Sequence, residues 1–248
     1  MQQEKSQRVF SHQFDEDIQT IINLIKKKEN FTLARFADGE YACMNALHCN
    51  GIDGWTVGPE DKELAEDLTE AYTHTEKNFF YGISCPCCDL PKHEWLKEKT
   101  DHDWGNITYS NIFVNANFNT FAHFVIEELD RPVVLIGNEN AVQGGYPFTV
   151  KQFVPVKSDI VTWYRTDREQ IHETFIDLAK QYEDTLFFVS AGPLSEIIIS
   201  KMYKTNPNNT YVDVGSSIDV WTHRKLTRAF QDPRTHYAQQ SCVFSEKE

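Results

Sequence analysis

The sequence predicts an α/β fold with a mainly parallel sheet, and two observations carry this prediction. Short apolar segments alternate along the chain with segments of helical periodicity, which is the order typical of repeated strand–helix units. In addition, the segment 133–137 (VVLIG) is apolar throughout and ends on a glycine, and other apolar segments also run into a glycine. Apolar runs without polar alternation indicate strands that helices cover on both faces.

The first half of the chain contains two predicted helices and two predicted strands. Residues 13–28 carry Phe14 and several isoleucines at the spacing of one helix face, and 31–36 (FTLARF) predict a strand that ends at 37–40 (ADGE). A helix is expected over 59–76, with Pro59 near its first turn. A buried strand is expected over 79–83. The segment 84–110 lacks a clear period, so we expect it to be irregular.

The second half repeats this alternation. A helix from Phe118 to Leu129 precedes the strand 133–137, and a helix over 167–182 is predicted to start with Thr166 and Glu169 as a capping box. A strand over 185–190 leads into a helix over 194–204, and a last strand covers 210–215. Because the chain has no Pro/Gly/Ser-rich linker and no internal repeat, we expect one domain over residues 1–248.

Composition excludes several classes of partner. The formal net charge is −13, and the largest basic cluster is 26–28 (KKK), so a nucleic-acid backbone and an anionic membrane surface are disfavoured. No apolar run approaches the ~18–20 residues that span a bilayer. Residues 1–5 (MQQEK) lack the layout of a secretory signal. We therefore expect a cytoplasmic protein without a membrane span.

Polar residues and glycines gather where the predicted strands end. In an open α/β sheet the ligand lies beyond the carboxyl ends of the strands. Four of these ends carry a glycine, which lets the backbone approach a ligand closely, and three add carboxylates or amides. These strand ends are 38–40 (DGE), 137–140 (GNEN), 190–193 (SAGP) and 213–219 (DVGSSID).

Asp38 and Glu40 are the candidate metal ligands. They place two carboxylates on either side of Gly39, and Mg²⁺ or Mn²⁺ is typically held by one or two carboxylates together with substrate phosphates and waters. Arg35, in the preceding strand, can pair with a phosphate or orient a carboxylate. The alternative interpretation is a simple turn, because Asp-Gly is a common loop dipeptide.

The segments 35–41 (RFADGEY) and 211–219 (YVDVGSSID) together resemble the bacterial GT-D glycosyltransferase family. In that family an Arg-Phe/Tyr-Gly-Asp-Gly-Glu segment opens the domain, and a segment with Asp-x-Gly and a later Asp closes it. The similarity covers about residues 15–230. Two departures stand out: Ala37 replaces the usual glycine, and Ser216 and Ser217 stand where family members have a Gly-His pair.

The resemblance implies a Rossmann-like single domain in which Asp38 and Glu40 hold Mn²⁺ or Mg²⁺ against the diphosphate of a UDP-sugar. It implies transfer of the sugar to a hydroxyl of a glycan or glycoconjugate acceptor. Asp219 is the expected base for the acceptor hydroxyl, with Asp213 and Glu139 as alternatives. The residues expected to bind the donor, from the resemblance and from the strand ends, are Arg35, Gly39, Gly137, Asn138, Asp213, Gly215, Ser216 and Ser217.

Several other features leave alternatives open. The six cysteines are expected to be reduced thiols, and the run Cys85-Pro86-Cys87-Cys88 has no second clean pair of the kind that structural zinc sites use. Trp55 and nearby aromatics can stack on a sugar ring, although core packing is their commoner role. His223 and Arg224 are expected on a helix after the last strand.

Two other functions remain possible on the sequence alone. One is a metal-dependent phosphohydrolase acting on nucleoside-diphosphate sugars, and the other is a non-catalytic interaction module stabilised by zinc. The sequence does not indicate the donor sugar, the acceptor or the anomeric outcome. It also leaves open whether the protein forms a homo-oligomer.

Overall fold

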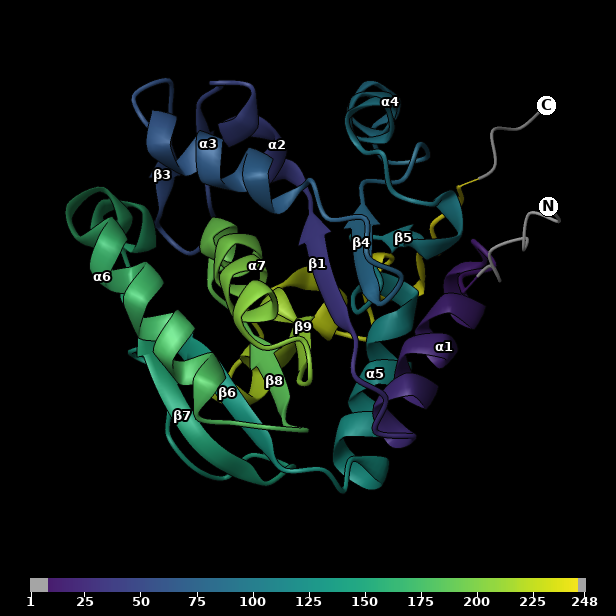
Figure 1. Cartoon of the computed structure of the whole chain (residues 1–248). Coiled ribbons are helices and arrows are strands. Elements are labelled where there is room, and N and C mark those ends of the chain that lie inside the picture. Colours follow the sequence, from purple (N-terminus) through teal and green to yellow (C-terminus); the bar gives the residue numbers. More distant parts are fainter. Residues whose placement is uncertain (1–8, 245–248) are drawn as a thin grey trace, which may run out of the picture.

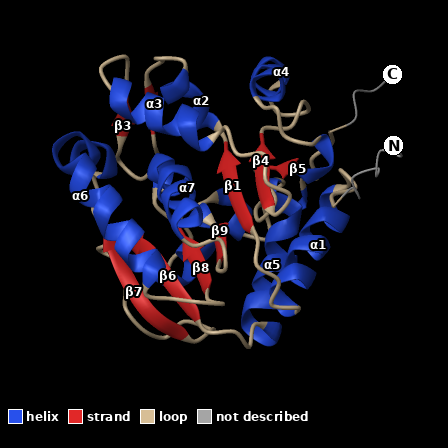
Figure 2. Ribbon diagram, viewed as in Figure 1, coloured by secondary structure: helices blue, strands red, loops and turns tan. Residues whose placement is uncertain are grey.

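The computed structural model describes residues 9–244 of the chain, and its centre is a seven-stranded sheet in the order β5-β4-β1-β9-β8-β6-β7. All neighbouring strands in this sheet run parallel, which confirms the predicted α/β fold (Figures 1 and 2). The strands are β1 (Thr32–Phe36), β4 (Phe79–Ile83), β5 (Ile107–Tyr109), β6 (Val133–Asn138), β7 (Val150–Val156), β8 (Leu186–Val189) and β9 (Thr210–Asp213).

Helices cover both faces of the sheet, and two consecutive residues of β8 show this directly. The Phe187 ring lies 5.1 Å from the Tyr211 ring, and the Tyr211 hydroxyl donates to carbonyls of Met202 and Asn206 at the end of α7. Phe188 points to the other face, where its ring contacts that of Phe121 in α5. The helices are α1 (Phe14–Lys26), α2 (Asp38–Met44), α3 (Lys62–Ala71), α4 (Leu90–Lys99), α5 (Phe118–His123), α6 (Ile160–Lys180), α7 (Ser195–Thr205) and α8 (Asp219–Thr222).

The helical layers are unequal. Helices α3 and α6 pack against α7 on one face of the sheet, and α1 lies beside α5 on the other (Figure 1). The predicted helix from Phe118 to Leu129 is confirmed in outline, with α5 continuing as a π-helical turn over Phe124–Glu128. Because both faces are covered, strands β4, β8 and β9 are buried along their whole length, as their apolar sequences predict.

Besides α2, three regions of secondary structure were missed in the sequence. The segment 84–110, expected to be irregular, contains α4 and the short edge strand β5. Strand β7 was overlooked because Pro155 interrupts its pattern, and proline is tolerated there because β7 is an edge strand. The third is a small antiparallel hairpin of β2 (Cys49–Asn50) and β3 (Thr56–Val57).

Two predicted helix starts are wrong. Helix α6 begins at Ile160, and Asp159 caps it by accepting a hydrogen bond from the amide of Thr162 at 3.2 Å. The capping signal at Thr166 coincides instead with a kink inside the helix, where Asp167 has non-helical φ and ψ of −130° and 24°. Helix α3 starts at Lys62 rather than near Pro59, because Asp61 accepts a hydrogen bond from the amide of Gly58 and the turn between them precedes the helix.

The two ends of the described chain lie together. Gln13 pairs with Val243 in an antiparallel bridge, and the Phe244 ring lies 4.0 Å from the ring of Tyr109 in β5. Residues 1–8 and 245–248 are outside the described part, and so is the N-terminal segment on which the absence of a signal was predicted. Within residues 9–244, no helix combines the length and apolar character needed to cross a membrane.

Candidate functional site

Two cavities open at the edge of the sheet where the carboxyl ends of the strands meet. The β8–β9 cavity, of about 250 Å³, is formed by the loops after β6, β7, β8 and β9 and by the β2–β3 hairpin. The β4–β5 cavity, of about 510 Å³, is formed by the loops after β1, β4 and β5 and by the C-terminal segment. Ligands of open α/β sheets bind at this edge.

Asp38 faces the β4–β5 cavity. It is the first residue of α2, which follows β1 after Ala37 alone. Its side chain is 80% exposed and forms an ion pair with Lys92 of α4. Lys92 also lies 3.2 Å from a carboxylate oxygen of Asp89. Asp38 is therefore a carboxylate that a ligand in this cavity can reach.

Glu40 points the other way. Its side chain is buried, and its carboxylate accepts a hydrogen bond from the backbone amide of Ala37 at 2.8 Å, as a glutamate in the first turn of a helix commonly does. Burial raises the pKa of Glu40 to about 7, and the nearby charge of Asp213 acts in the same direction. The Glu40 side chain therefore caps the N-terminus of α2 and is partly protonated at neutral pH.

The two carboxylates fit a divalent cation unequally. Asp38 is exposed beside a cavity and fits as a ligand, with substrate phosphate and water completing the coordination. The Glu40 carboxylate has to leave the amide of Ala37 before it can contribute. No third acid or histidine lies close enough to form a cation-binding group with them in the described chain. Joint metal binding by Asp38 and Glu40 stays a prediction.

Arg35 and Asp213 form a buried ion pair beneath the edge. The Nε of Arg35 donates to both the carboxylate and the backbone carbonyl of Asp213, at 2.8 Å each, and its Nη1 donates to the carbonyl of Ser110 at 2.8 Å. Neither side chain lines either cavity. In this structure the two predicted donor-binding residues bind each other and fix the loop after β9 against β1.

Glu196 is a buried acid that the sequence analysis missed. It lies in the first turn of α7, it is 1% exposed, and one of its carboxylate oxygens has no hydrogen-bond partner among the described residues. Burial raises its pKa, and the charges of Glu40 and Asp213 add to this effect. The sequence did contain a signal, because Glu196 directly precedes the apolar run 197–199 (III).

The β8–β9 cavity collects four of the predicted residues: Asn138, Gly215, Ser216 and Asp219. Asp219 begins α8 and is buried, and its carboxylate accepts a hydrogen bond from the hydroxyl of Thr227 at 2.7 Å. Burial raises the pKa of Asp219, while Thr227 and Arg228 oppose this change. A carboxylate with a raised pKa in a cavity is suited to accept a proton.

Basic side chains line the same cavity as Asp219. Lys157, His223 and Arg228 all line the β8–β9 cavity, and Arg228 lies 3.7 Å from the carboxylate of Asp219. Arg228 also donates twice to Asp53 of the β2–β3 hairpin, at 2.8 Å each. The cavity therefore contains two basic side chains that can contact an anionic ligand, Lys157 and Arg228, and two carboxylates that balance their charge, Asp53 and Asp219.

Trp55 packs between the start of α2 and the loop after β8. It lines the β8–β9 cavity from the β2–β3 hairpin, and three glycines make room for its ring. A Cβ on Gly39 would lie 2.7 Å from the ring, one on Gly192 would lie 3.0 Å from it, and one on Gly51 would overlap it. Because Gly39 follows Asp38, Trp55 connects the start of α2 to the loop after β8.

Ser217 and Gly137, which were also predicted to bind the donor, lie outside both cavities. Ser217 is buried, and its hydroxyl donates to the carbonyl of Val214 at 2.6 Å. Gly137 lies within β6 beside Phe153. His223 and Arg224 were expected on a helix, but α8 ends at Thr222, and Arg224 has a left-handed φ of 51°.

Glu139, an alternative base, also lies outside the β8–β9 cavity. Lys157 contacts its carboxylate at 3.0 Å and lowers its pKa. A lowered pKa makes a carboxylate a weaker base. Of the two acids, Asp219 is therefore better suited to accept a proton.

Comparison with known proteins supports the fold. The sequence matches no family model and no curated protein. A selenomethionine-substituted structure of domain of unknown function 1792 aligns with a TM-score of 0.54 and 15% identity, covering 84% of this chain and 80% of that one. Another domain of unknown function 1792, described as having a distinct glycosyltransferase fold, aligns with a TM-score of 0.55 and 14% identity, covering 92% and 90%. The chain therefore has an α/β fold similar to one described as a glycosyltransferase fold.

Proposed function

We propose that this protein is a metal-dependent glycosyltransferase that moves a sugar from a nucleotide-sugar donor, a UDP-sugar, to a hydroxyl group of a glycan or glycoconjugate. The observation that carries the proposal is the β8–β9 cavity at the carboxyl edge of the sheet, which the buried carboxylate of Asp219 shares with the basic side chains of Lys157 and Arg228. The likeness to a glycosyltransferase fold supports the same reaction class.

The donor occupies the β8–β9 cavity in this proposal. Its diphosphate is attracted by Lys157 and Arg228, since charge-assisted hydrogen bonds to phosphate are strong. Asn138 and Ser216 supply uncharged polar groups that fix the orientation of the ligand. The indole of Trp55 offers an apolar face at the wall that adjoins Gly39 and hence Asp38.

Asp219 acts as the base in the transfer step. The acceptor oxygen attacks the anomeric carbon, the bond from that carbon to the diphosphate breaks, and the acceptor proton passes to the carboxylate of Asp219. The raised pKa of Asp219 suits this role, because a general base works best when its pKa is near the operating pH. Thr227 holds the carboxylate in place through its hydroxyl.

Asp38 is the residue that would hold the divalent cation, and Glu40 would join it only after releasing the amide of Ala37. Because Asp38 lines the β4–β5 cavity, the diphosphate would have to extend from the β8–β9 cavity to Asp38 for a cation there to offset its developing negative charge. Lys92, the present partner of Asp38, would then be free to contact an anionic group in the β4–β5 cavity.

The test is a thermal-unfolding panel of nucleotides and nucleotide sugars, each measured with and without added Mn²⁺ or Mg²⁺. Metal is withheld by omission rather than by a chelator, because a chelator can also remove other metals. A ligand at 100 times its dissociation constant should add about 2.7 kcal/mol of stability. We expect UDP or a UDP-sugar to stabilise the protein, and to do so more strongly with the metal present.

Arg228→Gln provides the matched variant, with Arg234→Gln, at an exposed pair with Asp232, as the control. The first should weaken the stabilisation by UDP and the second should not. If no nucleotide stabilises the protein under any metal condition, the proposal is wrong. Release of free sugar at the same rate with and without acceptors would instead identify a hydrolase.

A further inference from the structure

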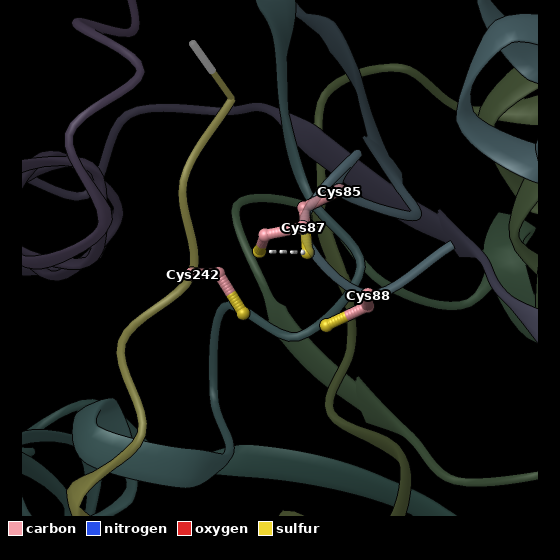
Figure 3. Close-up of side chains that lie close together, drawn as sticks. All are labelled: Cys85, Cys87, Cys88 and Cys242. Atoms are coloured by element: carbon pink, nitrogen blue, oxygen red, sulfur yellow. Dashed lines mark hydrogen bonds between the residues drawn. The ribbon is translucent and has the colours of Figure 1, made fainter. Parts of the chain in front are cut away.

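Four cysteines from two distant parts of the chain form one cluster. Cys85, Cys87 and Cys88 follow β4, and Cys242 comes from the C-terminal segment (Figure 3). The four sulfur atoms all lie within 4.8 Å of one another. Cys85 and Cys242 are buried, whereas Cys87 and Cys88 are exposed. This is the one group of three or more potential metal ligands in residues 9–244 that is compact enough to hold an ion.

A tight turn positions the first three thiols. The amides of Cys88 and Asp89 both donate to the carbonyl of Cys85, at 3.1 and 3.2 Å, and Asp89 then caps α4. Cys85 and Cys88 have the spacing of a Cys-x₂-Cys pair, and the turn brings their side chains to the same side. The sequence analysis counted the run as Cys-x-Cys-Cys and found no second pair, because the fourth ligand lies near the other end of the chain.

The C-terminal segment carries Cys242 to this turn. The amide of Ala116 donates to the carbonyl of Gln240 at 3.1 Å, and Val243 pairs with Gln13 on the other side of Cys242. The Phe244 ring packs on Tyr109. Cys242 is thus held in place from both sides and does not arrive at the cluster as part of a loose tail.

The spacing of the sulfur atoms suits one tetrahedral ion. Four thiolates around zinc, with Zn–S bonds of about 2.3 Å, place their sulfur atoms roughly 3.8 Å apart. The sulfur atoms of Cys85 and Cys87 lie 3.1 Å apart, and no two sulfur atoms of the cluster are more than 4.8 Å apart, so these separations lie on either side of that value. A disulfide needs about 2.05 Å, and all six cysteines are free thiols in this structure.

Hydrogen-bond donors surround the sulfur atoms from outside. The side-chain amide of Asn111 lies 3.5 Å from the sulfur of Cys242 and 3.8 Å from that of Cys88. The backbone amide of Val243 donates to the sulfur of Cys87 at 3.2 Å. Such outer contacts are typical of groups that stabilise thiolate ligands.

We infer that Cys85, Cys87, Cys88 and Cys242 bind one structural Zn²⁺ as a tetrathiolate site. Binding forms four Zn–S bonds and releases to solvent the protons of those thiols that are still protonated, with no change in oxidation state. All four positions are filled by protein sulfur, so the ion has no open position for a substrate or a catalytic water.

The zinc site fixes one wall of the β4–β5 cavity. That wall is formed by Cys85, Cys87 and Cys88 together with Tyr237 and Gln240 of the C-terminal segment, and the ion would lock these two segments together. The same cavity contains Asp38. The inference does not depend on the proposed transferase activity, since a structural zinc can be present whatever reaction the cavity serves.

The first test measures metal in the full chain, produced with zinc available and purified under reducing conditions. We expect one zinc per chain by elemental analysis, and the ligand-to-metal and ligand-field bands of a tetrahedral thiolate site after replacement by Co²⁺. Cys242→Ser should lose most of the zinc. The matched control is Cys49→Ser, a half-buried cysteine outside the cluster, which should retain it.

A second measurement on the wild-type protein avoids variants that fail to fold. Titration with a thiol-binding mercurial should release zinc in proportion to the modification of four cysteines, and proteolysis should then cut the C-terminal segment faster. Four free thiols without zinc, a disulfide within the cluster, or stoichiometric iron in place of zinc would each overturn the inference. Full zinc content in Cys242→Ser would do so as well.

Discussion

The Nε of Arg35 donates two hydrogen bonds to Asp213, one to its carboxylate and one to its backbone carbonyl, at 2.8 Å each. The two side chains are only 11% and 6% exposed. They join β1 and β9, which are neighbours at the centre of the sheet. A Cβ on Gly215, which has a left-handed φ of 46°, would overlap the guanidinium. This pair therefore shapes the loop that lines the β8–β9 cavity.

Removing the charge of Asp213 should destabilise the fold. Asp213→Asn removes the carboxylate with which the buried guanidinium of Arg35 is paired, and breaking a buried pair on one side costs about 3–5 kcal/mol. Urea denaturation of the purified variant measures this loss. Asp232→Asn, which breaks an exposed pair with Arg234, should leave the free energy of unfolding almost unchanged.

Unchanged stability together with a lost response to nucleotides would indicate that the Arg35–Asp213 pair binds the ligand instead of stabilising the fold. If Asp213→Asn unfolds at the wild-type urea concentration but no longer responds to nucleotides, then Arg35 and Asp213 serve the donor directly. That outcome would support the prediction that both residues bind it. It would also show that the ion pair contributes little to the stability of the fold.

Glu40 should make the stability of the fold depend on pH. Its folded-state pKa of about 7 lies above the ordinary value of 4.5, so the folded protein favours the neutral form. The stability that this provides is complete below pH 4.5 and is lost as the pH rises through about 7. The full change corresponds to roughly 3 kcal/mol. Glu196, whose pKa is also raised, should add a change of the same sign.

Glu40→Gln isolates the contribution of this residue. Glutamine resembles the neutral acid and can still accept the hydrogen bond from Ala37, so the variant should gain stability over the wild type at pH 8 but not at pH 4. Urea denaturation at both pH values gives the comparison. Glu128→Gln, which alters an exposed partner of Lys26, should keep the wild-type pH dependence. A Glu40→Gln variant that loses stability equally at both pH values would contradict the assignment.

The positions of Asp38 and Glu40 show what sequence patterns could and could not predict. The strand before them was predictable because its apolar run is a local pattern. Both carboxylates were expected to bind the metal because they flank Gly39 at a strand end, and in an extended segment two such residues would share a face. Helix α2 begins at Asp38, and in a helix such residues point about 200° apart. One acid therefore faces the cavity and the other faces the core.

The parts of the site that come from distant segments were not predictable. Four residues of the β8–β9 cavity were predicted because they lie at or just after the carboxyl end of a strand whose apolar sequence is recognisable. These are Asn138, Gly215, Ser216 and Asp219. Trp55 reaches the site through a hairpin of two-residue strands that leaves no periodic signal. The partners Cys242 and Arg228 come from the C-terminal segment, and only the tertiary fold brings them to the sheet edge.

Asp38→Asn should remove the metal dependence of the proposed reaction. The amide oxygen is a weaker ligand for a hard cation than a carboxylate oxygen, so Mn²⁺ or Mg²⁺ should bind less tightly. Transfer should fall by about 10²–10³-fold, as when one preorganised electrostatic group is lost. Because the Asp38 side chain is 80% exposed, the free energy of unfolding should change little. The measurement is a metal titration of the transfer rate.

Asp89→Asn is the control for this variant. It removes the other carboxylate near Lys92, so an effect that acts through Lys92 alone should appear in both variants. We expect Asp89→Asn to keep the wild-type metal titration, with a modest loss of stability from the weakened cap of α4. Equal metal titrations in the Asp38→Asn variant and the wild type would exclude Asp38 as a ligand.

Asp219→Asn should separate catalysis from donor binding. Asparagine keeps the shape of the side chain and can still accept the hydrogen bond from Thr227, so the fold and the stabilisation by UDP should persist. The transfer rate should fall by about 10²–10⁴-fold, because the group that accepts the proton is lost. In the wild type the rate should also fall as the pH drops through the raised pKa of Asp219, since the base is then protonated. The variant should lack this decline.

Asp53→Asn tests whether any carboxylate in the β8–β9 cavity would have the same effect. Asp53 lines the same cavity and pairs with Arg228, so its loss changes the local charge by the same amount as the loss of Asp219. Asp53→Asn should alter the affinity for the donor, because Arg228 is then free to contact a phosphate. The fall in the transfer rate at low pH should remain. Rate profiles over pH with saturating donor compare the two variants. If the fall in rate at low pH disappears equally in both variants, it is caused by the total charge of the cavity, and Asp219 is not the base.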